Sequence, residues 1–261
     1  MGVQSFDPDL LALMGRPHGP EAPFRVVEEA RRAGFDNLSV DLIYGLPGQQ
    51  PDCWANDLHR ATALGVEHVS AYLLETDKDT PLARRLETGE LEEPSAAQIE
   101  ALYEVTEELL SGCGFARYEV SNWARPGRAS RHNMGYWTDR PYIGFGASSH
   151  SYYLGVRSVC RLSATSYIQA VDRGQPRRVA LDDGSVGVRL TEAIVTALRL
   201  AQGADFDRIG ERYGTDLWRR YATELDEIVQ RGWARVQPPY VVLTRQGILW
   251  SMDALAPFAS A

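Results

Sequence analysis

The run Ser39-Val-Asp-Leu-Ile-Tyr-Gly-Leu-Pro-Gly-Gln49 predicts a strand that carries one acid among apolar residues and breaks directly into a glycine and proline loop. Side chains alternate along a strand, so Val40 and Leu42 share one face while Asp41 and Ile43 share the other. A carboxylate on a mostly buried strand needs a partner. For a lone aspartate the favoured interpretation is a turn cap or a pair with a nearby arginine, so the neighbouring strands decide between structure and function.

Two further segments have the pattern of strands that end in polar turns. Residues 2–6 carry Gln4, and residues 68–74 run into a polar segment. Helical patterns of apolar residues lie between the strands, at residues 24–33 and 54–64. Strand, helix, strand, helix, strand predicts a parallel α/β sheet or barrel, in which ligands gather at the carboxyl ends of the strands.

The composition is that of a protein with a core of its own and no affinity for polyanions. The chain has 261 residues, and its 35 acids outnumber 27 bases to give a formal charge of −8. This acidity argues against nucleic acid or an anionic membrane as a main partner. Three scattered cysteines argue against a disulfide framework, and neither a signal peptide nor a membrane-spanning apolar run is visible. These features predict the reducing cytoplasm.

The character of the sequence changes after about residue 160. Helical patterns are followed by a hairpin that turns at Pro238 and Pro239, which predicts a winged-helix-like module. Seven acids and seven arginines are interspersed over residues 205–245, whereas a module that binds a nucleic-acid groove has a basic stripe. A packing or docking domain is therefore favoured. We predict two domains, residues 1–160 and residues 161–261.

Several motifs occur in an order that resembles one family, the radical S-adenosylmethionine (SAM) proteins of the oxygen-independent coproporphyrinogen III oxidase type. The likeness covers nearly the whole chain and is greatest to the heme-chaperone branch called HemW. It implies an α/β fold: a partial radical-SAM, TIM-like barrel that lacks its first strands, plus a mainly helical carboxy-terminal domain. Besides the run that ends at Gln49, the motifs are Gly2-Val-Gln-Ser-Phe-Asp7, Leu13-Met-Gly-Arg-Pro-His18, Tyr118-Glu-Val-Ser-Asn122, His132-Asn-Met-Gly-Tyr-Trp137 and Tyr142-Ile-Gly-Phe-Gly146.

One family feature is missing from the sequence. The family holds a 4Fe-4S cluster with a Cys-x3-Cys-x2-Cys loop upstream of the Gly-Val-Gln strand, whereas Cys53, Cys113 and Cys160 are far apart. We interpret these three as small buried hydrophobic residues, not as cluster ligands. The resemblance therefore implies a chain that is truncated at its amino terminus.

The resemblance assigns SAM-binding positions to four residues. Gln4 and Asp41 match positions that contact the ribose and neighbouring groups, Arg16 matches one that contacts the amino-acid carboxylate, and Ile43 matches one that lines the adenine. The residue types suit these roles, because aspartate accepts from two hydroxyls, glutamine donates and accepts, and arginine forks onto a carboxylate. No residue is assigned a catalytic role.

The second candidate site is His132, which lies beside Tyr136 and Trp137. An imidazole so placed can ligate heme iron while the aromatics cover the macrocycle. Three arginines precede it and would meet the propionates: Arg125, Arg128 and Arg131. Without the resemblance, a histidine near aromatics is more often a hydrogen-bonded structural residue.

The loop before His150 departs from the family pattern. His150 is a weaker heme candidate than His132. Its loop has Ser148 where the family has the third glycine of Gly-x-Gly-x-Gly, which predicts a less open loop. Glu119 and Ser121 share a strand face and either line the barrel or face a substrate.

The function classes stay open at this stage. The favoured one is a HemW-type heme chaperone that binds heme and SAM and passes heme to an acceptor protein. The alternatives are an oxygen-independent coproporphyrinogen III oxidase, which turns propionates into vinyls, and a non-catalytic heme-binding module. An unrelated α/β lyase or hydrolase using Asp41 and His68 is disfavoured, because no metal site or nucleophile elbow accompanies them. Whether the chain is an enzyme is left open.

Overall fold

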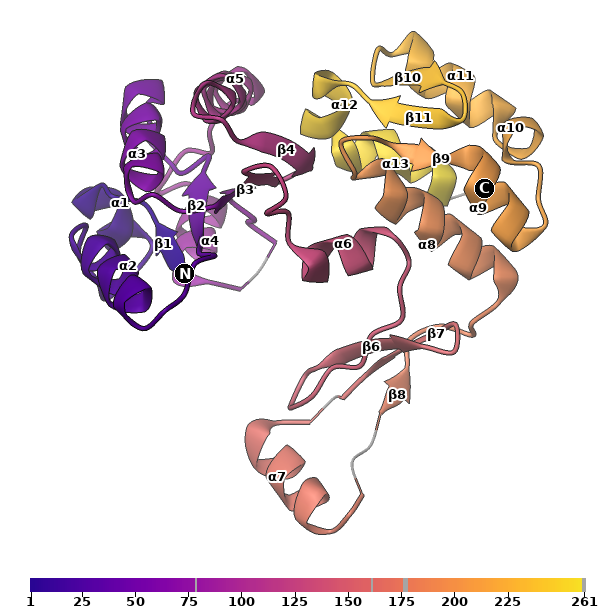
Figure 1. The fold of residues 1–261 in the computed structure, drawn as a ribbon, viewed down its shortest axis with the longest axis horizontal. Helices are drawn as coiled ribbons and strands as arrows, with labels where there is room; N and C mark the ends of the chain where they lie inside the picture. The colour runs from indigo at the N-terminus through magenta and orange to yellow at the C-terminus, as the bar shows by residue number, and fades with distance from the viewer. Residues whose placement is uncertain (78, 161, 176–177, 260–261) are drawn as a thin grey trace. The chain divides into compact units, whose positions relative to one another are not determined.

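A computed structural model describes residues 1–77, 79–160, 162–175 and 178–259. The chain divides into two compact units, residues 1–129 and residues 130–261, and each is described by itself (Figure 1). The predicted change of character near residue 160 lies inside the second of these units. The domain boundary at that position therefore stays a prediction.

The amino-terminal unit is built on one mixed sheet with the strand order β1-β2-β3-β5-β4. Strands β1 to β3 run parallel, while β5 is antiparallel to both β3 and β4. The predicted alternation of β2 is confirmed, because Val40, Leu42 and Tyr44 are buried and the residues between them are half-buried. The strands are β1 (Gly2–Gln4), β2 (Ser39–Tyr44), β3 (His68–Leu73), β4 (Ala116–Glu119) and β5 (Asn122–Ala124). Strand β5 was not predicted from the sequence.

Helices connect these strands, and the helices predicted from periodicity are present. Trp54 is fully buried, and its indole Nε1 donates to Thr106 Oγ1 at 2.8 Å, which joins α3 to α5. A capping box formed by Ser95 and Gln98 opens α5. The helices are α1 (Pro8–Leu13), α2 (Ala22–Arg32), α3 (Pro51–Ala63), α4 (Pro81–Glu87) and α5 (Ala96–Gly112).

The glycine and proline loop after β2 is folded tightly under the carboxyl end of the sheet. The side-chain oxygen of buried Gln49 accepts from the backbone amides of Gly45, at 2.9 Å, and of Leu46, at 3.3 Å. Gly45 has a φ of +76°, and a Cβ there would lie 2.6 Å from the Leu73 side chain. The positive φ and the close Leu73 side chain favour glycine at this position, where the chain turns at the end of β2, next to the site described below.

The carboxy-terminal unit combines a strand excursion with a helical module. The excursion contains α6 (Arg131–Trp137), β6 (His150–Tyr153), β7 (Val156–Val159), α7 (Ala164–Asp172) and β8 (Val179–Ala180), with the sheet order β6-β7-β8. The helical module contains α8 (Val186–Leu198), β9 (Ala204–Asp205), α9 (Phe206–Tyr213), α10 (Leu217–Arg220), α11 (Ala222–Gln230), β10 (Ala234–Gln237), β11 (Tyr240–Leu243), α12 (Arg245–Leu249) and α13 (Ser251–Ala259).

The helical module has the hairpin that the sequence predicted. Strands β10 and β11 pair across Pro238 and Pro239, and β9 adds to the other edge of β11. Before the hairpin, two short helices, α10 and α11, meet at Tyr221. Within the described residues, no helix has the length and apolar character needed to cross a membrane.

Candidate functional site

A cavity of about 740 Å³ opens at the carboxyl end of the parallel strands in the amino-terminal unit. Its walls come from β1, β2 and β3, from α1 with the turn after it, and from α4. Gln4, Arg16, Asp41 and Ile43 all line it. The structure thus brings together the four residues that the sequence singled out, from three separate segments of the chain. The volume is in the range of pockets that hold cofactor-sized ligands.

The sheet register places Asp41 and Ile43 on the cavity side of β2. Asp41 pairs with Ser70 and Ile43 with Tyr72 on the neighbouring strand β3. The Asp41 side chain keeps 35% of its surface exposed, and its carboxylate lies 3.9 Å from the amino group of Met1. The expected arginine pair is not found for Asp41 among the described residues, so most of its hydrogen-bonding capacity faces the cavity.

Gln4 occupies a strained backbone conformation at the end of β1. Its φ is +67°, and the amide of Ser5 donates to the carbonyl of Val3 at 2.9 Å, which closes a three-residue turn centred on Gln4. A turn of this kind with a positive φ is rare and costs on the order of 1–3 kcal/mol for a residue other than glycine. The β1–β2 register also shifts between Gly2 and Gln4. Strain of this kind is concentrated at functional sites.

Arg16 reaches the cavity from the turn that ends α1. The backbone amide of Arg16 donates to Leu11 O at 2.9 Å, and Gly15 before it has a φ of +66°. The side chain is exposed, and no carboxylate within salt-bridge distance is found for it in the described part of the chain. A guanidinium without a protein partner at the rim of a cavity is available to a ligand carboxylate.

The cavity also contains residues that the sequence analysis did not assign. Tyr72 lines it next to Ile43, and Leu82 and Arg85 line it from α4. The sequence does mark Tyr72, because it lies on the polar face of β3. It also marks helix α4, because Thr80 caps the helix, Pro81 occupies its first turn, and the buried Leu82 and Leu86 are one turn apart.

His68 does not line the cavity. It is 5% exposed at the start of β3, where Nδ1 lies 2.8 Å from Ser39 Oγ and Nε2 lies 2.8 Å from the Tyr118 hydroxyl. Burial lowers the pKa of His68 below its usual range, and the nearby Asp41 carboxylate opposes this shift. A disfavoured hydrolase or lyase site built on Asp41 and His68 gains no support from this geometry. Glu119 is likewise buried, and its carboxylate accepts from the Ser121 amide and the Asn122 side chain.

The second candidate, His132, lies on α6 in the carboxy-terminal unit. Its Nε2 is 2.9 Å from the Tyr136 hydroxyl, and the two rings meet edge to face with centroids 4.8 Å apart. Tyr142 stacks edge to face on Tyr136 at 4.7 Å. His132 is exposed, and no hydrogen bond to its Nδ1 is found within the described residues. The site therefore presents an imidazole at the end of a row of aromatic rings.

The arginines near this motif differ in their availability. Arg125 belongs to the amino-terminal unit, where its guanidinium donates to Val66 O and Cys113 O, at 3.4 Å each, and lies over the Phe115 ring. It is thus occupied by structural contacts. Arg128 and Arg131 are exposed.

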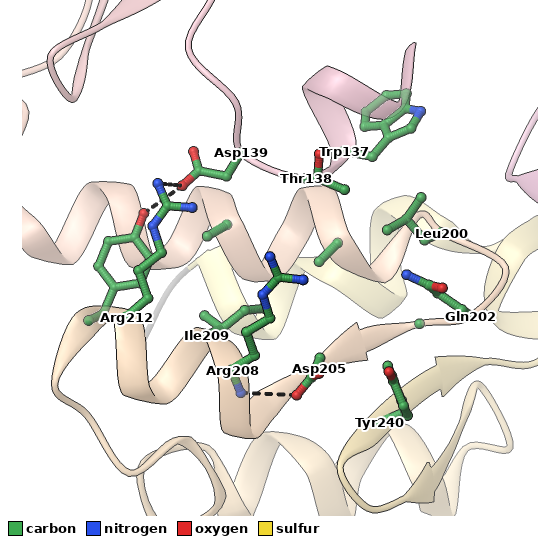
Figure 2. Close-up of a pocket in the computed structure, with 14 residues that line it drawn as sticks. Trp137, Thr138, Asp139, Leu200, Gln202, Asp205, Arg208, Ile209, Arg212 and Tyr240 are labelled. Atoms are coloured by element: carbon green, nitrogen blue, oxygen red, sulfur yellow. Dashed lines mark hydrogen bonds and ion pairs between the residues drawn. The ribbon is translucent and has the colours of Figure 1, made fainter. Parts of the chain in front are cut away.

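A smaller cavity, of about 110 Å³, lies between the last residues of α6, α8 and α9 (Figure 2). The nearly buried Asp139 carboxylate, at the end of one wall, is held by Arg212 at 3.0 Å and by the Tyr213 hydroxyl at 2.9 Å. Figure 2 shows Arg208 reaching toward the middle of this space, next to the row of small residues on α8. Arg208 is exposed, and the cavity holds only a small group.

The cysteines do not form a metal site. Cys160 is buried, as predicted, but Cys53 and Cys113 are only half-buried, so that interpretation was wrong for these two. Burial, with the nearby Asp57 and Asp7 carboxylates, raises the pKa of the Cys53 thiol to about 12, which disfavours the thiolate that a metal needs. In the described ranges, no three His, Cys, Asp or Glu side chains group as a metal site. The residues present therefore do not fit a 4Fe-4S cluster.

Comparison with known proteins places this geometry in a family. Residues 1–61 match the model of the radical SAM superfamily, and residues 187–250 match that of the HemN C-terminal domain. The heme chaperone HemW of Bacillus subtilis is 33% identical over 258 residues, which cover 98% of this chain and 68% of that protein. This chain belongs to the HemW family of radical SAM proteins.

Further relatives of the HemW family show the same partial coverage. The heme chaperone HemW of Mycobacterium tuberculosis is 37% identical over 80% of this chain and 54% of its own length. The mitochondrial radical S-adenosyl methionine domain-containing protein 1 of Danio rerio is 33% identical over 78% of this chain and 48% of its own length. The chain thus spans between about half and two thirds of the length of these HemW-family relatives.

A solved structure of the same fold confirms the predicted architecture. Coproporphyrinogen III oxidase (HemN) from Escherichia coli, a radical SAM enzyme, superposes with a TM-score of 0.78 at 22% identity, over 99% of this chain and 63% of that one. At this identity the likeness concerns the fold alone. The HemW-family chain therefore has the α/β fold of part of a radical SAM barrel, followed by a helical carboxy-terminal domain.

Proposed function

We propose that this chain is the SAM-binding and heme-binding part of a HemW-type heme chaperone. The observation that carries the proposal is the cavity at the carboxyl end of β1 to β3. Gln4, Arg16, Asp41 and Ile43, to which the family resemblance assigns SAM contacts, all line its walls. Family membership supports the heme half of the proposal, since the B. subtilis and M. tuberculosis relatives are heme chaperones by name.

The donor set of the cavity fits SAM. Asp41, half-exposed and oriented to the cavity, accepts from the two ribose hydroxyls, and the Gln4 amide donates and accepts beside it. The unpaired guanidinium of Arg16 takes the amino-acid carboxylate of SAM. Ile43, with Tyr72 beside it in the sheet, offers an apolar wall to the adenine. These side chains bind and orient the nucleotide; no step of radical chemistry is assigned to them.

Heme is the proposed cargo of the carboxy-terminal unit. If the Nε2–H of His132 donates to the Tyr136 hydroxyl, the tautomer leaves Nδ1 as the nitrogen that accepts the iron. The edge-to-face rings of Tyr136 and Tyr142 then offer an aromatic surface beside the macrocycle. The exposed Arg131 remains a candidate for the propionates, whereas Arg125 and Arg128 belong to the amino-terminal unit.

Two alternatives differ in what the chain does with these ligands. A coproporphyrinogen III oxidase would share the fold, but the B. subtilis and M. tuberculosis relatives, at 33% and 37% identity, are heme chaperones by name, which favours the chaperone. A non-catalytic heme-binding module describes the chain taken by itself, because its three cysteines cannot supply the cluster loop. We propose the cytoplasm as its location, and an acceptor protein for heme as its partner.

The experiment that tests the proposal measures both ligands on the same protein. Isothermal titration calorimetry of the chain with SAM, and a titration with hemin followed by heme absorption, are expected to give saturable binding of each. Absence of SAM binding at millimolar ligand would contradict the nucleotide half of the proposal. Absence of a saturable heme spectrum would contradict the cargo half, so the two halves fail separately.

A further inference from the structure

The strained turn at Gln4 is held in place by a buried acid outside the cavity. Asp57 lies on α3 and is fully buried. Its Oδ2 accepts from the hydroxyl of Ser5 at 2.6 Å, and its Oδ1 accepts from the backbone amide of Phe6 at 2.7 Å. Both carboxylate oxygens are thus used on the two residues that directly follow Gln4.

The same network continues into the next wall of the cavity. The backbone amide of Asp7 donates to Ser5 Oγ at 3.0 Å, and the Asp7 carboxylate caps α1 by accepting from the amides of Asp9 and Leu10. Helix α1 and the turn after it carry Arg16 to the rim. One buried carboxylate is therefore linked to the turn that contains Gln4 and to the helix that precedes Arg16.

Burying the carboxylate of Asp57 costs free energy of solvation. No salt bridge to Asp57 is found within the described residues, and the guanidinium of the nearby Arg60 is paired with Glu21 at 2.6 Å. Burial raises the pKa of Asp57 against the lowering effect of its two hydrogen bonds. A buried acid with no ion-pair partner loses solvation, so the presence of Asp57 at this position is best explained by the two hydrogen bonds that it accepts from Ser5 and Phe6.

The Gln4 side chain is confined from the other side as well. A Cβ on Gly2 would lie 2.7 Å from Gln4 Nε2, so the amide of Gln4 lies directly over the bare backbone of Gly2. Asp57 fixes the two residues that follow Gln4, and Gly2 leaves room for the side-chain amide of Gln4. Strained conformations persist only where the surroundings over-determine them, and these two contacts do so.

We propose that Asp57 is a positioning residue of the SAM cavity, acting through Ser5 and Phe6 to hold Gln4 in its left-handed turn with its amide at the cavity wall. The inference rests on the proposed SAM site. It makes no use of direct contact between Asp57 and the ligand, since Asp57 is not among the residues that line the cavity. The same reasoning assigns Gly2 the role of leaving room for the Gln4 amide.

The test is a double-mutant cycle on SAM affinity, measured by calorimetry, with Asp57→Asn, Gln4→Ala and the double variant. The asparagine side chain in Asp57→Asn would retain one acceptor but lose the one that takes the Ser5 hydroxyl, so we expect SAM binding to weaken about tenfold. If Asp57 acts through Gln4, Asp57→Asn has little further effect on affinity in the Gln4→Ala background. Its loss of thermal stability, in contrast, is expected in both backgrounds.

A matched control separates positioning from general damage to α3. Thr106→Val removes one of the two acceptors of the indole of Trp54, which lies one turn before Asp57 on the same buried face of α3, so it should lower stability without changing SAM affinity. Should Asp57→Asn fail to fold, Ser5→Ala removes one of the two hydrogen bonds and keeps the charge. Gly2→Ala is a third variant, which should displace the Gln4 amide and weaken SAM binding at little cost in stability.

The outcomes separate this inference from the proposed function. If the wild-type protein does not bind SAM, both the proposed SAM site and this inference are wrong. Wild-type protein that binds SAM, together with losses of affinity that simply add in the double variant, overturns the positioning role alone. An equal loss of affinity in Thr106→Val would also overturn it, because destabilised α3 would then be the cause.

Discussion

The hydroxyl of Tyr136 lies 2.9 Å from Nε2 of His132, one turn away on α6. This contact leaves a single ring nitrogen, Nδ1, without a partner in the described part of the chain. A histidine that ligates iron commonly uses its other nitrogen to donate to a neighbour, which fixes the ring and the tautomer. The pair therefore has the arrangement of a ligand and its orienting residue.

Substitution on α6 tests this arrangement. His132→Ala should abolish most heme binding, and Tyr136→Phe should weaken heme binding on the order of tenfold or more by releasing the ring. Heme absorption titrations measure both, with His59→Ala, at an exposed histidine on α3, as the control. Tighter binding in Tyr136→Phe would mean instead that Nε2 is the ligand and that Tyr136 competes with iron for it.

The carboxylate in the SAM cavity gives a second prediction. Asp41→Asn should weaken SAM binding roughly 10- to 100-fold, because a charged acceptor of two ribose hydroxyls is replaced by a neutral amide. Asp52→Asn is the matched control, since Asp52 is exposed on α3 and lies outside the cavity. Calorimetric titration measures both variants. Equal affinity in Asp41→Asn and Asp52→Asn would show that Asp41 does not contact the ligand.

The strain at Gln4 predicts opposite effects on stability and binding. Gln4→Gly should relieve a left-handed conformation that costs about 1–2 kcal/mol, against a loss of about 0.5–1 kcal/mol from the freedom of glycine in the unfolded chain. A net gain of roughly 0.5 kcal/mol in urea unfolding is expected, together with weaker SAM binding. Gln4→Ala is the control, because alanine removes the side-chain amide but keeps the Cβ that makes a positive φ unfavourable, so it should weaken SAM binding without the gain in stability. A Gln4→Gly variant that is less stable than wild type would contradict the strain.

Sequence patterns were sufficient for the elements whose periodicity is complete. Strand β2 alternates regularly, and α3 carries apolar residues at helical spacing, so both were predicted at nearly the right place. Strand β5 was missed because its three residues, Asn122 to Ala124, are all buried and have no alternation to detect. Helix α4 was missed because a seven-residue helix shows only one repeat of its period.

The site divides in a similar way between what sequence predicts and what it hides. The residue types of Gln4, Arg16 and Asp41 suggested ligand contacts only through the resemblance, and their convergence needed the fold. Asp57 had a signal of its own, because it lies one turn after Trp54 on the buried face of α3. A buried acid on an apolar helix face needs hydrogen-bond donors. The sequence does not show that these donors are Ser5 and Phe6, because they precede Asp57 by 52 and 51 positions and meet it only in the folded chain.

Ser148 gives a test in the carboxy-terminal unit. Its φ is +58°, a left-handed backbone conformation that glycine adopts freely and serine does not. The Ser148 amide donates to Cys160 O at 2.8 Å, which holds the loop. Ser148→Gly should therefore raise stability by about 0.5–1 kcal/mol in urea unfolding.

The neighbouring serine is the control for Ser148→Gly. The φ of Ser149 is not positive, so its backbone carries no comparable strain. Its hydroxyl donates to Gly146 O at 2.8 Å. Ser149→Gly should therefore lower stability by about 1 kcal/mol, from a lost hydrogen bond and added chain freedom. A destabilising effect of Ser148→Gly equal to that of Ser149→Gly would rule out strain at Ser148.

Buried His68 predicts how stability depends on pH. Because burial lowers its folded-state pKa below the usual value near 6.5, the unfolded chain binds the proton more readily. The contribution of neutral His68 is therefore full above about pH 6.5 and is lost as the pH falls toward the folded-state pKa. Wild-type protein should lose stability between about pH 7.5 and pH 5.5, and His68→Gln should lose less over the same interval. Urea unfolding at the two pH values measures this difference, and His59→Gln, an exposed histidine on α3, should keep the wild-type slope. An unchanged slope in His68→Gln would mean that the proton responsible for the loss of stability is taken up elsewhere, not by His68.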